Sequence, residues 1–170
     1  MEKNNIKIDD KELLTPEHDR LCIWVDNNFE NIIAKTLGLV RLPEYEIVYK
    51  KLEWESPIKN IGYVIGIPDF KYTFTIRTVK EPFLNFCGFI ECKPHILSIG
   101  DTMRQLKLYK SYYFTPHDRK ISQRVESEFK FPKNSTYEQQ MDFILITYDK
   151  KYKDLFEKQN IKYLVVNPKL

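Results

Sequence analysis

The stretch GFIECK, from Gly88 to Lys93, combines a carboxylate and an ammonium group with apolar side chains at strand spacing. Because side chains alternate along a strand, we expect Glu91 and Lys93 on one face and Ile90 and Cys92 on the other. Charged groups are costly on a buried strand unless they pair or serve a site. Two interpretations therefore stay open: an edge strand with a solvated ion pair, or a reactive site.

A second carboxylate, Asp69, follows the apolar run from Tyr63 to Ile67 and stands directly after Pro68. An aspartate after a proline is also typical of a plain turn. Two carboxylates that converge from neighbouring strands form the hard oxygen site that Mg²⁺ prefers. With Lys93 beside them they predict phosphoryl-ester hydrolysis, in which a metal activates water and the ammonium orients the water or the phosphate.

The segment RQLKLYK, which follows the Glu91 strand, adds an amide and a phenol to these candidates. Gln105 and Tyr109 are four residues apart, so a helix places them on one face, one above the other. In the plainer interpretation, Tyr109 belongs to the core and Gln105 to its boundary. The spacing alone does not choose between a site and a core.

Basic side chains on and after this helix are candidates for contact with phosphates. They are Arg104, Lys107 and Lys110 on the helix, and Arg119, Lys120 and Arg124 in the segment that follows. Aromatic residues between them suit stacking on bases. The same segment also carries acids such as Asp118 and Glu126, so a charge-mixed, solvated loop explains it equally well.

Periodicity and turn residues predict the element order α-β-β-β-α-β-α-β. The first helix should begin at Pro16, with Thr15 as its N-cap, and run to about residue 37 with a break near Asn27. After it we expect strands 45–55, 62–72 with a continuation 73–79, and 88–93, a helix from 98 or 101 to 113, a strand 143–147, a helix 150–159 and a strand 161–166. Short turns predict antiparallel pairing early in the chain, and intervening helices predict parallel pairing late.

These elements predict an α/β fold with a mixed central sheet flanked by helices. We expect a polar lead at residues 1–14 and a single domain at 15–170 with a charged insertion at about 115–137. The chain has 170 residues, 42% of them hydrophobic and 30% charged, which is typical of a globular domain. The net charge of +3 permits an anionic partner without arguing for one.

The cysteines and the apolar runs limit the classes of protein that remain. The three cysteines are widely spaced in apolar surroundings, which indicates reduced core residues. Three cysteines are also too few for a four-cysteine metal site. No apolar run approaches the length of a membrane span, and the polar start of the chain does not resemble a secretory signal. A cytoplasmic protein with no membrane partner is therefore expected.

The order of the candidate residues along the chain resembles that of the PD-(D/E)XK nuclease superfamily, and is closest to its RecB-like branch. The matching residues are Asp69, then Glu91-Cys92-Lys93, then Gln105-x-x-x-Tyr109. The resemblance spans roughly residues 15–166 and implies a restriction-endonuclease-like core. It implies that Asp69, Glu91 and the backbone carbonyl of Cys92 bind Mg²⁺ or Mn²⁺. It also implies that Lys93 is the catalytic lysine, and that Gln105 and Tyr109 contact the DNA backbone or organise the site.

Further metal ligands are expected from neighbouring elements. His18, near the start of the first helix, matches the histidine that RecB-like members often contribute from that helix; an exposed first-turn histidine is the alternative. Glu30 is a second helix candidate. Glu55, with Glu53 on the same strand face, is a candidate flanking ligand, although such pairs more often belong to a solvated sheet face.

The resemblance implies metal-dependent hydrolysis of phosphodiester bonds in DNA, with RNA not excluded, in a mobile-element, phage or repair setting. A homodimer is compatible with such a nuclease, and unwinding would need a separate partner protein because the chain has no P-loop. One alternative is an inactive nucleic-acid-binding or assembly module with the same fold. Another is a structural protein in which Lys93→Ala changes stability by under about 1 kcal/mol.

Overall fold

The computed structural model describes residues 16–42, 44–60, 63–79, 83–113, 129 and 139–167. The elements are, in order, α1 (Pro16–Asn27), α2 (Phe29–Thr36), η1 (Leu39–Arg41), β1 (Tyr45–Trp54), β2 (Ile58–Asn60), β3 (Tyr63–Gly66), β4 (Phe70–Thr78), β5 (Leu84–Lys93), α3 (Ile99–Tyr113), β6 (Gln139–Thr147), α5 (Lys153–Glu157) and β7 (Lys162–Val165). The predicted polar lead, and all of the predicted insertion except Phe129, lie outside the described residues.

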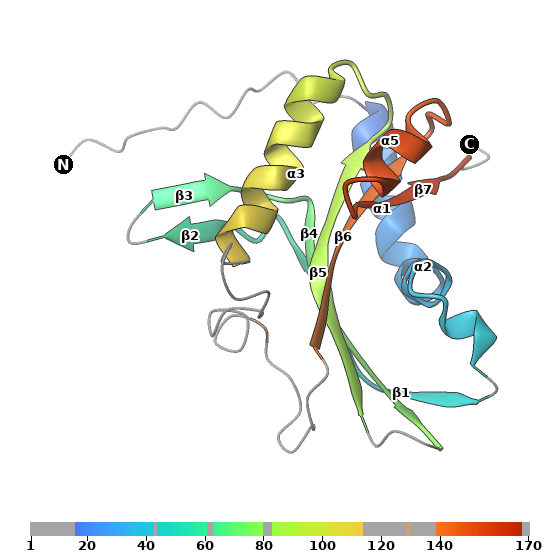
Figure 1. Cartoon of the computed structure of the whole chain (residues 1–170). Coiled ribbons are helices and arrows are strands. Elements are labelled where there is room, and N and C mark those ends of the chain that lie inside the picture. Colours follow the sequence, from blue (N-terminus) through green and yellow to red (C-terminus); the bar gives the residue numbers. More distant parts are fainter. Residues whose placement is uncertain are drawn as a thin grey trace.

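A five-stranded sheet in the order β1-β4-β5-β6-β7 forms the centre of the molecule, with β5 as its middle strand (Figure 1). β4 pairs antiparallel with both β1 and β5, whereas β6 pairs parallel with both β5 and β7. The predicted change from early antiparallel to late parallel pairing is confirmed. β5 is thus an interior strand, so the expectation of an edge strand with a solvated ion pair is wrong.

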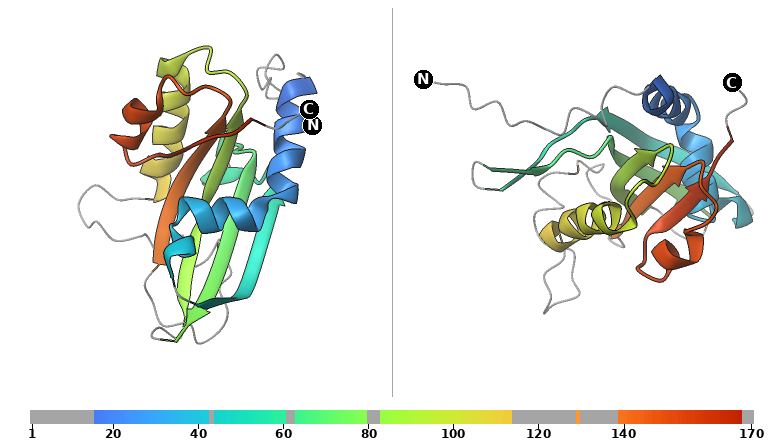
Figure 2. Two further views of the ribbon diagram at one scale, coloured as in Figure 1. Left: turned by 90° about the vertical axis from the view of Figure 1, so that its right-hand side faces the viewer. Right: turned by 90° about the horizontal axis from the view of Figure 1, so that it is seen from above.

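Helices cover both faces of this sheet, which confirms an α/β fold with a mixed central sheet (Figure 2). α1 and α2 pack on one face, where Val25, Phe29 and Ile33 meet Phe74 and Ile90. α3 and α5 cover the other face. The core there is formed by side chains from both helices and from the central strands, among them Leu106, Tyr109, Phe156, Phe89, Phe143 and Leu145.

The first predicted helix is broken in the expected place. α1 ends at Asn27, and the side-chain amide of Asn28 donates to the Trp24 carbonyl at 2.8 Å, which satisfies a carbonyl at the end of the helix. α2 then continues at an angle to α1 (Figure 2). Gly38 follows with a φ of 71°, a left-handed conformation that favours glycine after a helix end.

The prediction of a strand over residues 62–72 is wrong. The chain leaves β3 at Gly66, bends through Ile67-Pro68-Asp69 and enters β4 at Phe70. Pro68 has no N–H to donate to a ladder, so it ends the first run, and residues 70–72 belong to the same strand as 73–78. Asp69 therefore stands directly before β4 and not within a strand.

β2 and β3 form a separate two-stranded hairpin beside α3 (Figure 1), and β2 was not predicted. The Tyr112 hydroxyl donates to the Lys59 carbonyl and joins α3 to this hairpin. A strand of three residues, Ile58–Asn60, is too short to carry a periodic signal. In the part of the chain that the structure describes, no helix is long and apolar enough to cross a membrane.

The remaining differences concern where elements begin and end. β5 starts at Leu84 instead of residue 88, and the buried Asn85 within it accepts a hydrogen bond from the Thr75 hydroxyl at 2.9 Å. β6 also begins earlier than predicted, whereas α5 is shorter than the expected helix 150–159. In β5 the polar Asn85 interrupts an apolar run, and β6 begins with Gln139 and Gln140, so local hydropathy does not mark where either strand starts.

Candidate active site

The start of β4 and the end of β5 bring the two predicted carboxylates to the same part of the sheet. Phe70 pairs with Ile90, so Asp69 and Glu91 each lie one residue beyond a paired position. The Cys92 backbone N–H donates to Asp69 Oδ2 at 2.6 Å, and this bond fixes the carboxylate against β5. The expected convergence of the two acids from neighbouring strands is therefore observed.

Glu91 is buried in the middle of the molecule, with a residue exposure of 3%. Its Oε1 accepts a hydrogen bond from Gln105 Nε2 at 2.7 Å and lies 3.4 Å from Lys93 Nζ. Its Oε2 is also buried and has no hydrogen-bond partner among the described residues. Glu91 and Lys93 share a face as predicted, but their ion pair is buried and not on the surface.

The surroundings of Glu91 disfavour its charged form. Burial and then the charge of Asp69 raise the pKa of Glu91 to about 8, against the opposing effects of Lys93 and Gln105. A second positive charge near Oε2 would stabilise the carboxylate. The buried oxygen without a partner thus lies where a cation would be favoured.

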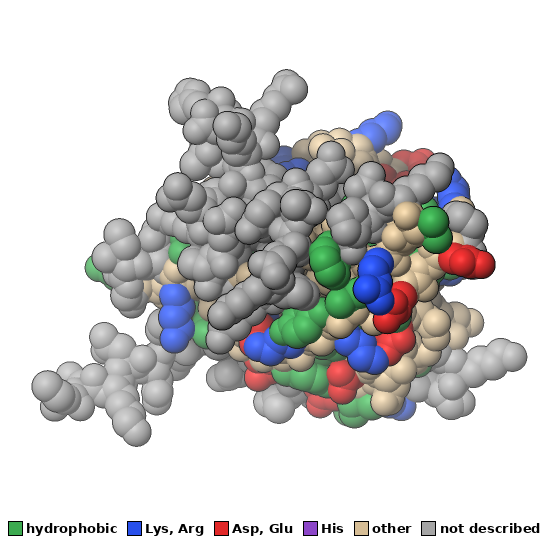
Figure 3. Space-filling model, turned by 90° about the horizontal axis from the view of Figure 1, so that it is seen from below, with side chains coloured by type: hydrophobic (Ala, Val, Ile, Leu, Met, Phe, Trp, Pro, Cys, Tyr) green, Lys and Arg blue, Asp and Glu red, His purple; other side chains and the backbone are tan. Residues whose placement is uncertain are grey.

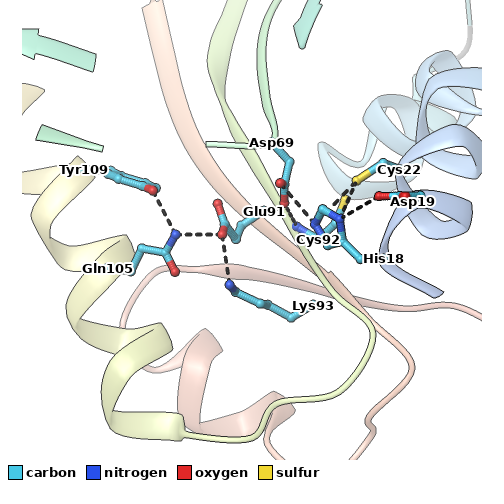
Figure 4. Close-up of polar contacts among 9 residues, drawn as sticks. All are labelled: His18, Asp19, Cys22, Asp69, Glu91, Cys92, Lys93, Gln105 and Tyr109. Atoms are coloured by element: carbon cyan, nitrogen blue, oxygen red, sulfur yellow. Dashed lines mark hydrogen bonds and ion pairs between the residues drawn. The ribbon is translucent and has the colours of Figure 1, made fainter. Parts of the chain in front are cut away.

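α3 supplies the amide and the phenol at the spacing that the sequence predicted. Gln105 Nε2 donates both to Glu91 and, at 2.9 Å, to the hydroxyl of Tyr109 (Figure 4). Tyr109 itself is buried. Tyr109 therefore belongs to the core, as the plainer interpretation predicts, and its hydroxyl holds Gln105 toward Glu91.

Gly66, at the end of β3, is a positioning residue that the sequence analysis missed. A Cβ on Gly66 would lie 2.2 Å from Cε1 of Tyr109, so only glycine lets the phenol ring pack here. The Tyr109 ring in turn places the hydroxyl that contacts Gln105. A glycine at the end of an apolar run was the available signal, although the sequence did not indicate its partner.

His18 approaches Asp69 from the other side, as Figure 4 shows. Its Nε2 lies 3.2 Å from Asp69 Oδ1, and its Nδ1 lies 3.6 Å from Asp19 Oδ1. The hydrogen bond with Asp69, followed by one with Cys22, raises the pKa of His18 to about 11. The predicted first-helix histidine is thus at the site and is only 14% exposed in its side chain.

The Cys22 thiol lies beside His18 and the Cys92 thiol beside Cys22, and the sequence analysis assigned both thiols only to the core. Cys22 Sγ is 3.7 Å from His18 Nε2, and a hydrogen bond with the Cys92 thiol is the main cause that lowers the pKa of Cys22. Burial is the main cause that raises the pKa of Cys92. The prediction that the cysteines are free and buried is confirmed.

The other predicted site residues lie away from these contacts or outside the described residues. Glu55 stands in the turn after β1, and its side chain is exposed. Its backbone N–H donates a hydrogen bond to the Asp69 carbonyl at 2.9 Å. Glu30 and Glu53 pair with lysines, Lys50 and Lys51 respectively. Of these acids only Glu53 is part of β1, while Glu30 lies on α2 and Glu55 in the turn after the strand.

The predicted basic residues fall into two groups. Arg104 pairs with Asp101 and Lys107 is exposed, both on α3, while Lys110 Nζ lies 3.5 Å from the Gln159 carbonyl. Arg119, Lys120 and Arg124 lie outside the described residues. Seen from below, at the end of the molecule opposite the carboxyl end of β5, basic and acidic side chains are interspersed over the described part (Figure 3).

Comparisons of the chain with protein-family models, curated proteins and solved structures find no match. The class of the site is therefore argued from its own geometry. In the described part of the chain, Glu91 has a buried carboxylate oxygen without a hydrogen-bond partner, and Asp69 lies directly before the neighbouring strand β4. Donor atoms of His18, Cys22 and Asp69 lie within 4.8 Å of one another. Carboxylate, imidazole and thiolate groups are the types of side chain that bind divalent cations in proteins.

Proposed function

We propose that the protein is a metal-dependent nuclease of the PD-(D/E)XK type, which hydrolyses phosphodiester bonds of DNA. The observation that carries the proposal is Glu91, a buried acid on the middle strand with one oxygen held by Gln105 and the other without a partner among the described residues. An ionised carboxylate in such a place is costly, so Glu91 is stabilised either by keeping a proton or by a cation that completes its surroundings, and we propose the cation as its functional partner.

The residues that would hold the cation are Asp69, Glu91 and the backbone carbonyl of Cys92, with His18 as a further ligand. Bound Mg²⁺ or Mn²⁺ lowers the pKa of a water and stabilises charge on a phosphate. Asp69 is oriented by the Cys92 N–H and Glu91 by Gln105, so both carboxylates are fixed before a ligand arrives.

Lys93 has the role of positioning the reacting groups. Its ammonium lies 3.4 Å from Glu91 Oε1, and its side chain is 12% exposed, so the ammonium lies at the boundary between the buried acid and solvent. An ammonium there can hold a water for in-line attack or donate to a phosphate oxygen. Tyr109 acts through Gln105 and is a positioning residue.

The test is a cleavage assay on labelled single-stranded, duplex and branched DNA, with RNA in parallel, in Mg²⁺, Mn²⁺ or EDTA. Wild type is compared with Glu91→Gln, Lys93→Ala and the matched control Glu46→Gln. Glu46 is an exposed acid of β1 that pairs with Arg77, at the end of that strand away from Trp54 and Asp69. We expect metal-dependent cleavage that both site variants lose and the control keeps.

The result that would overturn the proposal is a lack of cleavage on every substrate in every metal. DNA binding that is independent of metal and intact in both site variants would then favour the inactive binding module. Thermal denaturation with and without Mg²⁺ separates the cases further, because a protein that binds the cation in its folded state gains stability from it. Glu91→Gln should reduce this gain.

A further inference from the structure

The α1 side of Asp69 carries a second set of donors that differs in chemistry from the Glu91 side. His18 and Cys22 are four residues apart on α1 and therefore lie on the same face of this helix. They face Asp69, and donor atoms from the three residues all lie within 4.8 Å of one another. The three side chains thus offer one nitrogen, one sulfur and one oxygen to a common point.

The two distances from His18 to the other donors fit a tetrahedral zinc site. With zinc bond lengths of about 2.0 Å to nitrogen or oxygen and about 2.3 Å to sulfur, tetrahedral angles separate nitrogen from oxygen by roughly 3.3 Å and sulfur from nitrogen by roughly 3.6 Å. In the structure His18 Nε2 lies 3.2 Å from Asp69 Oδ1 and 3.7 Å from Cys22 Sγ. A cation could therefore be bound with little movement of these atoms.

Neighbouring groups lie beside two of the three donors, His18 and Asp69. Asp19 Oδ1 lies 3.6 Å from His18 Nδ1, beyond hydrogen-bond distance but near the ring nitrogen through which a carboxylate can orient a metal-binding imidazole. The Cys92 N–H holds Asp69 Oδ2 and leaves Oδ1 toward His18. The side chains of His18 and Asp69 are 14% and 13% exposed, which gives a cation a route from solvent.

We propose that His18, Cys22 and Asp69 form a binding site for a thiophilic divalent cation, with Zn²⁺ as the ion that fits, and that this site shares Asp69 with the Glu91 side. The mixed nitrogen, sulfur and oxygen donors favour Zn²⁺ over Mg²⁺, which prefers oxygen alone. On binding, the Cys22 thiol and the His18 ring each release a proton to solvent, so that thiolate and neutral imidazole coordinate the ion.

Occupation of this site has a consequence for the other side of Asp69. Zn²⁺ held by Cys22 draws Asp69 Oδ1 and His18 away from a cation at Glu91, so Zn²⁺ inhibits a reaction that Mg²⁺ supports. This inhibition rests on the proposed nuclease function, whereas the binding itself does not. The two statements can therefore fail separately.

Binding is tested with Cd²⁺, a thiophilic ion whose bond to a thiolate gives a charge-transfer absorption in the ultraviolet. We expect wild type to develop this band with one Cd²⁺ per chain, and Zn²⁺ to remove it by competition. Cys22→Ser should lose the band, and His18→Ala should bind Cd²⁺ at least about tenfold more weakly. Circular dichroism of each variant without metal checks that it folds.

The matched control is Cys87→Ser. Cys87 is as buried as Cys92 and lies on the same strand, but it packs on the α3 face in the other core cluster. This variant should keep the band. The proposal is overturned if wild type gives no band, or if the band survives Cys22→Ser.

The inhibition is tested by adding Zn²⁺ to cleavage reactions that contain Mg²⁺, with each variant compared with its own rate in the absence of Zn²⁺. Wild type and Cys87→Ser should be inhibited, and Cys22→Ser should need at least about tenfold more Zn²⁺. A Cd²⁺ band without any cleavage activity supports the cation site and counts against the nuclease. Cleavage without a Cd²⁺ band does the reverse.

Discussion

The two faces of β5 near Asp69 carry opposite kinds of chemistry. On the α3 face, Glu91 meets an ammonium and an amide, and on the α1 face the Cys92 thiol meets Cys22. Strand alternation is the cause, since neighbouring residues of one strand point to opposite faces. Asp69 enters at the start of the next strand and contacts groups of both faces, the Cys92 N–H and the His18 ring.

This difference teaches how a small fold can separate hard and soft donors by one residue of sequence. Oxygen donors and an ammonium gather where α3 covers the sheet, and sulfur and imidazole gather where α1 covers it. The helices decide the partners, and the strand decides which side chain faces which helix. Asp69 is the residue through which a ligand on one face would affect the other.

The largest expected effect therefore comes from Asp69→Asn. This variant should lower metal-dependent cleavage by at least about 100-fold and also weaken the Cd²⁺ band, because an amide does not supply the charge that either cation needs. Glu91→Gln should lose cleavage and keep the band. A cleavage assay and a Cd²⁺ titration on both variants measure this, and an intact band in Asp69→Asn would mean that the faces do not share Asp69.

The next largest effect is on stability and its dependence on pH without metal. Glu91 keeps its proton up to about pH 8 in the folded protein but loses it near its ordinary pKa of 4.5 when unfolded. Unfolding between these values releases a proton, so the free energy of unfolding falls as the pH rises, by roughly 5 kcal/mol from Glu91 alone.

Glu91→Gln removes this loss and should make the protein more stable than wild type at pH 8 in EDTA. Urea denaturation at pH 5 and pH 8 measures the difference between the two proteins. His18, whose pKa is also raised, affects both proteins alike and cancels in the comparison. If the free energy of unfolding changed with pH by the same amount in the two proteins, Glu91 would be ionised at both pH values and its burial would not raise its pKa.

Gly66→Ala should destabilise the protein by about 1–3 kcal/mol, because the added methyl group overlaps the buried ring of Tyr109. Its matched control is Gly100→Ala in α3, where an added Cβ meets Arg104 Nη1 at an ordinary 3.6 Å and the change should be neutral or slightly stabilising. Thermal denaturation measures both. Equal effects would mean that the hairpin is not packed on Tyr109.

The smallest expected effect is the loss of one phenol hydroxyl, compared between Tyr109 on the α3 face and Tyr72 on the α1 face of the sheet. Tyr109→Phe loses the hydroxyl that accepts from Gln105 and should cost about 1 kcal/mol. Tyr72→Phe, on the α1 face, removes a buried hydroxyl that has no hydrogen-bond partner among the described residues, so it should be neutral or stabilising. Urea denaturation gives both values, and a larger loss for Tyr72→Phe would contradict the assigned contacts.

Most of the fold near the site could be predicted from local patterns. The alternation in Glu91-Cys92-Lys93 predicted the two faces of β5, and the helical spacing predicted that Gln105 and Tyr109 would share one face of their helix. The prediction of a strand over residues 62–72 was wrong because the apolar run continues through Pro68, and hydropathy does not show that proline lacks the N–H a ladder needs. Cys22 was assigned only to the core, because its helix position gave no sign of what lay opposite.

The sequence by itself determined most of the element order, apart from β2 and the division between β3 and β4, and it determined the change from antiparallel to parallel pairing. It also determined which residues of one strand or helix share a face. These follow from periodicities that span a few residues. Only the tertiary structure decided that His18 and Cys22 face Asp69, that Gly66 lies under Tyr109, and that Glu91 is buried on a middle strand. The physical reason is that such contacts join residues distant in the chain, and their partners are chosen by how whole elements pack.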